Sequence, residues 1–377
     1  MGWATVPQFA PCLVSSRRAF ASGHGNNDQH SRESMKRIAC YAALTAVSLF
    51  PCLPALAQDY SGHTLVVGTW GGDIERLLRE HVAGPLEAKT GAKVEFLLGG
   101  SGDRMSKMVA ERNNPTMDVT FQNIYEAPAA LKEGLVVAPD AALVPTAADV
   151  WPGMNDGCYA MSLVGLGIAY SKALFPEAPE WADLWKAEFK GKMAYAPYPS
   201  SEGDGMLAVA ARIAGVNEHD PDAAFAKLAE LGAPVLSYSS LDEVFTLMDA
   251  GEIAAAPMIS GYVLSNLGNY EGIGFVFPKN PGPVLVRDMV CQVANSPEPE
   301  LAQMFIDLAL SVETQTAYAR ELNFGPTNSK VELTEEEAAR VINTPEEVSS
   351  LLQLDWSYVI EQRSDWTDRW NKQILGQ

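Results

Sequence analysis

The chain has 377 residues, a length that suits two domains of ordinary size better than one. Hydrophobic residues make up 47% of it, which is enough for packed cores and excludes a chain that is disordered throughout. The formal net charge of −20 at pH 7 argues against nucleic acid and anionic membranes as partners and is compatible with a cationic ligand.

The N-terminal region has the features of a secretory signal peptide. Residues 35–37 (MKR) are a short basic segment, residues 38–53 are mostly apolar, and residues 55–57 (ALA) form a small-x-small cleavage site. The apolar stretch is shorter than the ~20 residues that span a bilayer, which argues against a membrane anchor. We therefore predict a signal peptide over 35–57 and a periplasmic protein.

Residues 1–34 precede this signal, are polar and lack hydrophobic periodicity. A translation start at Met35 is the preferred explanation, and an extended leader is the alternative. In both cases we expect these residues to fall outside the fold. The segment 1–57 carries five basic and two acidic residues, so its removal leaves a net charge of −23.

The mature chain begins with alternating strand and helix signals. A β-branched run at 64–68 ends at a glycine, apolar residues follow helical spacing over 74–82, and Gly91 ends that helix. The alternation continues with predicted strands over 94–98 and 118–121 and a predicted helix over 104–112. This order favours a mostly parallel sheet covered on both faces by helices.

The pattern returns in the middle of the chain, and the last third is helical. We predict strands over 192–196, 235–238 and 253–259, and helices over 206–214, 223–231, 241–250, 300–310, 314–322, 335–341 and 356–374. Ser240 is expected to cap the helix that begins at Leu241. Two α/β units without a flexible joint suggest two lobes that share crossing segments.

Three consecutive predicted strands are each followed by polar or aromatic residues. Trp70 lies among glycines after the first strand, Ser101 follows the second, and Asn123 and Tyr125 follow the third. Ligands bind at the carboxyl ends of strands in open α/β sheets, so we expect these side chains at one edge of a binding site. The alternative for Trp70 is a core position beside a tight turn. The stretch around Trp70 lacks the spacing of a dinucleotide fingerprint.

The stretch at 199–205 (PSSEGDG) precedes the helix predicted over 206–214. Ser200, Ser201 and nearby backbone N–H groups can hold a carboxylate or a hydroxyl, and Glu202 can hold a cation. Plain helix capping is the alternative.

Enzymatic chemistry has little support. The chain has no G-x-S-x-G motif, and no histidine of the mature chain has a recognisable catalytic context. Cys158 and Cys291 remain after signal cleavage, and a disulfide and two buried free thiols explain them equally well. No Cys/His cluster has metal-ligand spacing, so we predict no metal and no cofactor. A secreted hydrolase is the alternative from a different class.

Five stretches together resemble the periplasmic solute-binding proteins of ABC importers, of the spermidine/putrescine type. They are VVGTWGGD with EAKTGAKVEFLLGG, DVTFQNIYEAPAALKEGLV, EWADLWKAEFKGKM, GFVFPKNPGPVLVRDMVCQVANSPEPELAQMFIDLAL, and NFGPTNSK. The resemblance covers nearly the whole mature chain, and WADLW with the following FKG is its most specific part.

The resemblance implies a two-lobed α/β periplasmic binding protein of type II, in which each lobe is a sheet flanked by helices and the ligand occupies the cleft. Residues 58–165 and 287–335 are expected to form lobe 1, and residues 166–286 and 336–377 lobe 2. The implied function is capture of a small polar solute, preferably amine-bearing and polyamine-like. An amino-acid-like or short organic-acid ligand is the alternative. The expected partners are an inner-membrane permease and its cytoplasmic ATPase, and a monomer is expected.

The resemblance also carries site residues over by position. Trp70 and Tyr125 match family aromatics, Asn123 replaces a serine, and Asp288 matches the acid that grips a ligand amine. A structural ion pair, with Arg287 or a lysine, is the alternative for Asp288. Family tryptophans fall at Met258 and near Val286, so the aromatic box of a polyamine site is incomplete. The expected ligand-binding set is Trp70, Ser101, Asn123, Tyr125, Ser200, Ser201, Glu202, Met258, Asp288 and Trp356.

Overall fold

The computed structural model describes residues 59–238 and 240–376. The predicted signal peptide and the segment before it lie outside the described residues. All described residues belong to one compact unit, Ala55–Gln377. Within this part of the chain, no helix is both long and apolar enough to cross a membrane.

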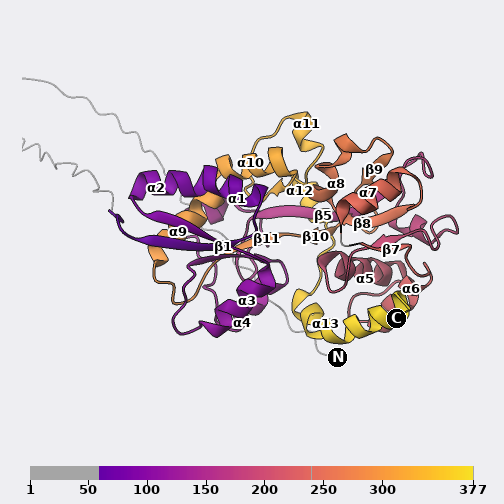
Figure 1. The fold of residues 1–377 in the computed structure, drawn as a ribbon, viewed down its shortest axis with the longest axis horizontal. Coiled ribbons are helices and arrows are strands. Elements are labelled where there is room, and N and C mark those ends of the chain that lie inside the picture. Colours follow the sequence, from indigo (N-terminus) through magenta and orange to yellow (C-terminus); the bar gives the residue numbers. More distant parts are fainter. Residues whose placement is uncertain (1–58, 239, 377) are drawn as a thin grey trace, which may run out of the picture. The chain divides into compact units, whose positions relative to one another are not determined.

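The first of two five-stranded sheets combines segments that are far apart in the sequence (Figure 1). Its strand order is β2 (Lys93–Leu98), β1 (Thr64–Thr69), β3 (Val119–Asn123), β11 (Asp288–Gln292) and β4 (Tyr159–Ala160). β1 pairs in parallel with β2 and β3, as the alternation of strands and helices predicts. β11 is antiparallel to both of its neighbours, so a strand from the last third of the chain completes a sheet that the first third begins.

The second sheet is built around one long strand. β5 (Ser162–Ser171) pairs with β8 (Ala255–Ile259), β9 (Ile273–Val276), β10 (Val284–Val286) and β12 (Gly325–Pro326). Every one of these pairings is antiparallel, so the expectation of a mostly parallel sheet is wrong for this half of the molecule. All ten residues of β5 are buried, which removes the alternation of polar and apolar residues by which a half-exposed strand is recognised. A short parallel pair, β6 (Ala194–Tyr195) with β7 (Leu236–Ser237), lies beyond it.

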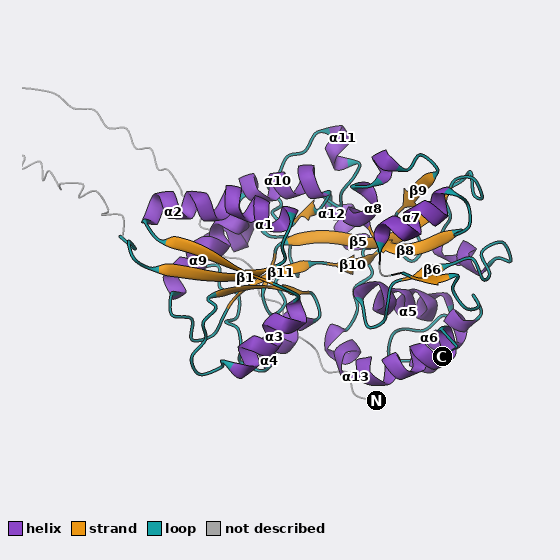
Figure 2. Ribbon diagram, viewed as in Figure 1, coloured by secondary structure: helices purple, strands orange, loops and turns teal. Residues whose placement is uncertain are grey.

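Helices surround both sheets (Figure 2). They are α1 (Asp73–Leu78), α2 (Gly84–Thr90), α3 (Ser101–Ala110), α4 (Glu126–Lys132), α5 (Ser201–Ile213), α6 (Pro221–Ala229), α7 (Leu241–Asp249), α8 (Ser260–Leu264), α9 (Pro299–Ala309), α10 (Val312–Leu322), α11 (Glu335–Ala338), α12 (Pro345–Ser350) and α13 (Trp356–Arg369). Short π-helical segments, η1 (Arg79–Ala83) and η5 (Trp370–Ile374), join α1 to α2 and extend α13. Three 3₁₀ turns are η2 (Pro145–Asp149), η3 (Trp181–Trp185) and η4 (Leu267–Asn269).

Several predicted helix ends are found where the sequence places them, and two details differ. Gly91 closes α2 with a left-handed backbone, φ 75°, as expected of a glycine that ends a helix. α5 begins at Ser201 instead of Met206, because Ser200 caps it and the following SEGDG stretch is already helical. Ser240 occupies the N-cap position of α7, but its side chain makes no capping hydrogen bond.

The chain crosses between the two sheets at three places, of which two are adjacent and the third lies between β11 and β12. It leaves the first sheet between Ala160 and Ser162 and returns to it between Val286 and Asp288. Cys158 and Cys291 form a disulfide beside these crossings, with their Cα atoms 5.0 Å apart. Of the two explanations for these cysteines, the structure therefore has the paired one.

Candidate ligand-binding site

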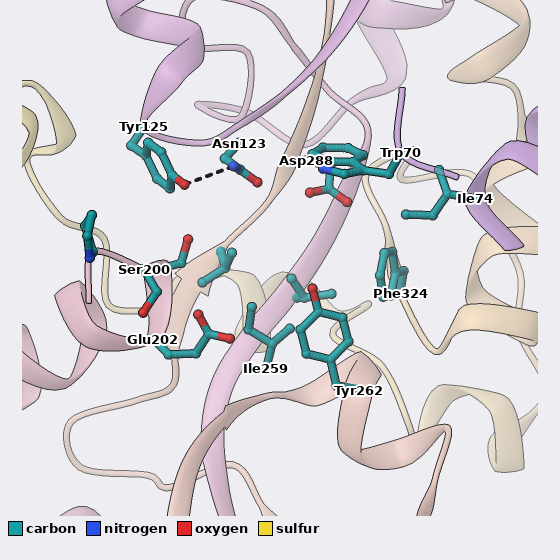
Figure 3. A pocket seen from close by; sticks show the side chains of 14 residues that line it. Trp70, Ile74, Asn123, Tyr125, Ser200, Glu202, Ile259, Tyr262, Asp288 and Phe324 are labelled. Carbon is teal, nitrogen blue, oxygen red and sulfur yellow. Dashed lines mark hydrogen bonds between the residues drawn. The ribbon is translucent and has the colours of Figure 1, made fainter. Parts of the chain in front are cut away.

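A cavity of about 410 Å³ lies where the two sheets meet, and its size is in the range of small-molecule sites (Figure 3). Fourteen residues line it: Trp70, Ile74, Asn123, Tyr125, Val164, Pro199, Ser200, Ser201, Glu202, Ile259, Tyr262, Val286, Asp288 and Phe324. They come from both sheets and from the helices that follow their strands. Seven of the ten predicted ligand-binding residues are among them.

The first wall of the cavity belongs to the first sheet. Trp70 directly follows β1, and Asn123 ends the neighbouring strand β3. Asp288, at the start of β11, lies directly opposite Asn123 in the antiparallel pair, so both side chains project from the same face of the sheet. The Asn123 side-chain amide donates to the Tyr125 hydroxyl at 3.0 Å and to the Ser101 hydroxyl at 2.6 Å. This wall is therefore a connected polar surface with an aromatic ring at each side.

The second wall is the start of α5. Ser200 is its N-cap residue, and its hydroxyl accepts a hydrogen bond from the Gly203 backbone N–H at 3.1 Å. Gly203 allows close packing here, because a Cβ at this position would come within 2.5 Å of the Tyr198 ring. Ser201 and Glu202, in the first turn of α5, also line the cavity. Ser200 thus caps α5, and the same segment also lines the cavity.

Two carboxyl groups enter the cavity from opposite walls, Asp288 beside Trp70 and Glu202 beside Ser200 (Figure 3). Burial raises the pKa of Asp288 to about 6, although a hydrogen bond from Ser162 and the positive charge of Arg104 offset part of the rise. Burial likewise raises the pKa of the Glu202 carboxyl. A raised carboxyl pKa means that the charged form lacks the stabilisation it has in water. Both groups are therefore suited to accept a cation.

The surroundings of Asp288 differ from those expected for a structural ion pair. The Ser162 hydroxyl donates to Asp288 at 3.3 Å, and no ion pair within 4.0 Å involves Asp288 among the described residues. Arg287 lies between β10 and β11, and its buried guanidinium pairs with Asp156 at 2.7 Å. The ion pair with Arg287, given above as the alternative for Asp288, is not formed.

Three predicted ligand-binding residues lie outside the cavity wall. Ser101 is buried behind Asn123 and reaches the cavity only through that hydrogen bond. Met258 is fully buried in the core of the second sheet, because its neighbour on β8, Ile259, takes the alternating position that faces the cavity. Trp356 is also buried. The centroid of its ring lies 5.9 Å from that of Tyr125, so Trp356 packs behind a residue of the cavity wall.

Seven lining residues were not predicted, namely Ile74, Val164, Pro199, Ile259, Tyr262, Val286 and Phe324. Tyr262 could have been found by the rule that found Asn123, because it lies in α8, directly after the predicted strand over 253–259. Phe324 lies within the quoted NFGPTNSK stretch. The aliphatic members carry no signal that distinguishes them from core residues.

Among the described residues, the cavity wall contains no Lys, Arg or His side chain. No group of three or more His, Cys, Asp or Glu in the described part of the chain could hold a metal ion. The wall therefore offers carboxylates, hydroxyls, one amide and aromatic rings. These groups suit reversible binding of a polar, cationic solute.

The family model described as bacterial extracellular solute-binding protein matches residues 82–345, well over half of the chain. The chain belongs to this family. Family membership confirms the predicted binding role and contradicts the hydrolase alternative, because the homologues are solute-binding proteins and not enzymes. The protein is the solute-binding component of an ABC transporter, a component that delivers a small molecule to a membrane permease and its ATPase.

This solute-binding protein is similar to named periplasmic relatives and to a solved structure. It is 28% identical over 294 residues to a periplasmic protein of Salmonella paratyphi A provisionally named as 2-aminoethylphosphonate-binding, over 75% of this chain and 83% of that one. It is 25% identical over 301 residues to the gamma-aminobutyric acid-binding protein of Pseudomonas aeruginosa, over 75% and 82%. The crystal structure of an ABC transporter from Clostridium perfringens matches it with a TM-score of 0.73 and 29% identity, over 82% and 99%.

These matches show the two-lobed α/β fold predicted for the solute-binding protein. They place it in the broader family, and the spermidine/putrescine type inferred from the five stretches stays a prediction.

Proposed function

We propose that the protein captures a small amine-bearing solute in the periplasm and delivers it to an inner-membrane ABC permease. The observation that supports this most directly is the pair of carboxyl groups, Asp288 and Glu202, that face one cavity whose wall holds no basic side chain among the described residues. The proposal keeps the lobe boundaries expected from the sequence, 58–165 with 287–335 and 166–286 with 336–377, and a monomeric protein.

The energetics favour an ammonium group at Asp288. A buried carboxylate without an ionic partner is unfavourable, and the raised pKa of Asp288 reflects that cost. An arriving ammonium supplies both the countercharge and N–H donors, and charge-assisted hydrogen bonds of this kind are about twice as strong as neutral ones. Trp70 beside the carboxyl adds a flat surface on which the methylene groups of the ligand can pack.

Glu202 favours a ligand with a second amine. Because Glu202 and Asp288 approach from opposite walls, a polyamine-like chain can place one ammonium group at each carboxylate. Both carboxylates would then gain a partner in the same event. This arrangement supports the polyamine-like solute as the first candidate.

A second candidate is an amino-acid-like solute with one amine and one acidic group. The Ser200 and Ser201 hydroxyls at the start of α5 can donate hydrogen bonds to an acid, and a helix N-terminus favours negative charge. The names of the two similar proteins, for 2-aminoethylphosphonate and gamma-aminobutyric acid, fit the same chemistry. In this case Asp288 still holds the amine.

A thermal-shift titration of residues 58–377 tests the proposal. The probes are putrescine, spermidine, gamma-aminobutyric acid, 2-aminoethylphosphonate and, as an acid without an amine, succinate. A ligand that binds only the folded state raises the melting temperature with the logarithm of its concentration. We expect at least one amine to do so and mass spectrometry to recover it unchanged. A shift with succinate alone would overturn the amine assignment, and chemical conversion of the ligand would overturn the binding role.

A further inference from the structure

Tyr125, in the cavity wall, packs against the C-terminal helix α13. The guanidinium carbon of Arg363, on α13, lies 3.7 Å from the centroid of the Tyr125 ring. Trp356, two turns earlier on the same helix, lies 5.9 Å from that ring. Neither Arg363 nor Trp356 lines the cavity. Tyr125 therefore has the ligand cavity on one side and a cation with an indole on the other.

The same guanidinium also holds the opposite wall. Arg363 donates to a carboxylate oxygen of Asp204 through Nε at 3.1 Å and again through Nη2. The Tyr198 hydroxyl donates to the other oxygen of Asp204 at 2.7 Å. Asp204 is fully buried and lies on α5, two residues after Glu202. Arg363 is thus in contact with both structural units that form the cavity, the turn after β3 and the first turns of α5.

We propose that Arg363 is a positioning residue for ligand capture, which joins Tyr125 on the first wall to α5 on the second. This inference rests on the proposed function, because it assigns a role within the same cavity. Arg363 does not touch the solute. It acts by joining the ring of Tyr125 to the helix that carries Glu202 when the two walls have closed to the separation at which both reach one ligand.

The contacts of Arg363 with Tyr125 and Asp204 depend on the planar shape of its guanidinium. A planar group can stack on an aromatic ring and donate in its own plane to a carboxylate at the same time, which an ammonium cannot do. Arg363→Lys keeps the charge beside Asp204 and gives up the stacking on Tyr125. A cation–π contact at a partly buried position corresponds to about a 3- to 30-fold change in an equilibrium constant.

The test measures association and dissociation rates of putrescine, gamma-aminobutyric acid and 2-aminoethylphosphonate with the wild-type protein and Arg363→Lys. If Arg363 holds the two walls together around the solute, dissociation becomes about 3- to 30-fold faster while association changes little. Arg363→Gln, which keeps a planar amide without the charge, is the second variant should the lysine protein not fold, and faster dissociation is expected there too.

Two controls separate positioning from general stability. Lys132→Met removes the exposed ion pair of Lys132 with Glu361, 3.3 Å apart, which joins α4 to α13 without involving the cavity. Its ligand rates should equal those of the wild type. In a Tyr125→Leu background, Arg363→Lys should add little to the dissociation rate, because the ring through which it acts is gone.

Binding with unchanged rates in Arg363→Lys, or an effect of full size in the Tyr125→Leu background, would overturn the inference and leave the proposed function standing. Failure of the wild-type protein to bind any of the three amines would overturn both together.

Discussion

Asp288 and Arg287 are neighbours in sequence with opposite surroundings. Arg287 pairs with Asp156, whereas Asp288 lines the cavity and has no ion pair among the described residues. The ion pair that their adjacency suggests is thus not formed, and the ligand-binding role of Asp288 stays a prediction.

Asp288→Asn should keep the shape of the cavity and remove its charge. Loss of a charge-assisted hydrogen bond in a desolvated site costs on the order of 2–5 kcal/mol, or roughly 30- to several-thousand-fold in affinity for an amine. Calorimetric titration of both proteins measures this. Equal affinities would remove Asp288 from the binding site, and tighter binding of succinate by the variant would show that the ligand is an acid.

The raised pKa of Asp288 predicts two pH effects. Between about pH 4 and pH 6 the folded protein holds a proton that the unfolded chain has lost, so this group lowers the stability of the ligand-free protein as pH rises through that window. The advantage of Asp288→Asn in unfolding free energy should therefore grow from pH 4 to pH 6 and then stay constant. Denaturant titrations at several pH values measure it, and an advantage that is constant over this range would contradict the assignment.

The affinity for an amine should depend on pH in the opposite direction to the stability of the ligand-free protein. The amine pairs with the ionised carboxyl, so affinity should fall as pH drops below about 6 in the wild type. Asp288→Asn should lose that part of the dependence.

At the scale of elements, the disulfide and the crossing strands occupy the same place. Cys291 is on β11, three residues after Asp288, and Cys158 directly precedes β4, the neighbour of β11 in the sheet. The bond closes a loop between residues 133 apart in the sequence. The disulfide therefore lowers the conformational entropy of the unfolded chain strongly. In the folded protein it ties β11, the strand that carries Asp288, to the start of β4.

Reduction of this disulfide should destabilise the protein by about 2–5 kcal/mol. The measurement is a denaturant titration with and without dithiothreitol, and the double variant Cys158→Ser/Cys291→Ser serves as control because it should be insensitive to the reductant. A wild-type protein whose midpoint is unaffected by complete reduction would contradict the prediction.

The sequence predicts individual elements well where a local pattern marks them. Helix α13 and its extension η5 together span the predicted helix over 356–374, and β1 and β2 agree within a residue at either end. β5 was missed because both of its faces are buried, so that its apolar residues do not alternate. The antiparallel pairings were missed because local patterns carry no information about which distant strands become neighbours.

The same limit applies to the cavity. Trp70 and Asn123 could be predicted because they follow strands whose carboxyl ends meet at one sheet edge. Met258 and Trp356 are implied by the family resemblance. Met258 is adjacent to the lining residue Ile259, and Trp356 packs behind Tyr125. The arrangement of Arg363 with Tyr125 and Asp204 unites three distant segments, and no spacing in the sequence indicates it.

For the whole molecule, the two crossings beside the cavity are the expected hinge. A protein whose lobes are joined at adjacent crossings can close around a solute with small changes in a few residues. Small-angle scattering of residues 58–377 should show a smaller radius of gyration when the amine that shifts the melting temperature is added at saturating concentration. An unchanged radius would contradict closure, and Asp288→Asn at the same ligand concentration provides the control.

Export is a prediction about residues outside the described part of the chain. The mature protein should begin at Gln58 or within a residue or two of it, because the ALA site ends at residue 57. N-terminal sequencing of periplasmic protein tests this, and folded, exported protein that begins at Met1 or Met35 would contradict it.

The position of β11 between β3 and β4 also determines the order in which the protein can fold. The first sheet cannot be completed until residue 292 is available, although β1, β2 and β3 are synthesised long before. A nascent chain that ends before Asp288 has no strand to join β3 to β4 and leaves an edge of β3 open to pairing with other chains. Such long-range pairing is slow, because a large loop must be closed before the contacts form. For a chain exported unfolded, as the signal peptide predicts, this sheet is completed only after residues 288–292 have crossed the membrane.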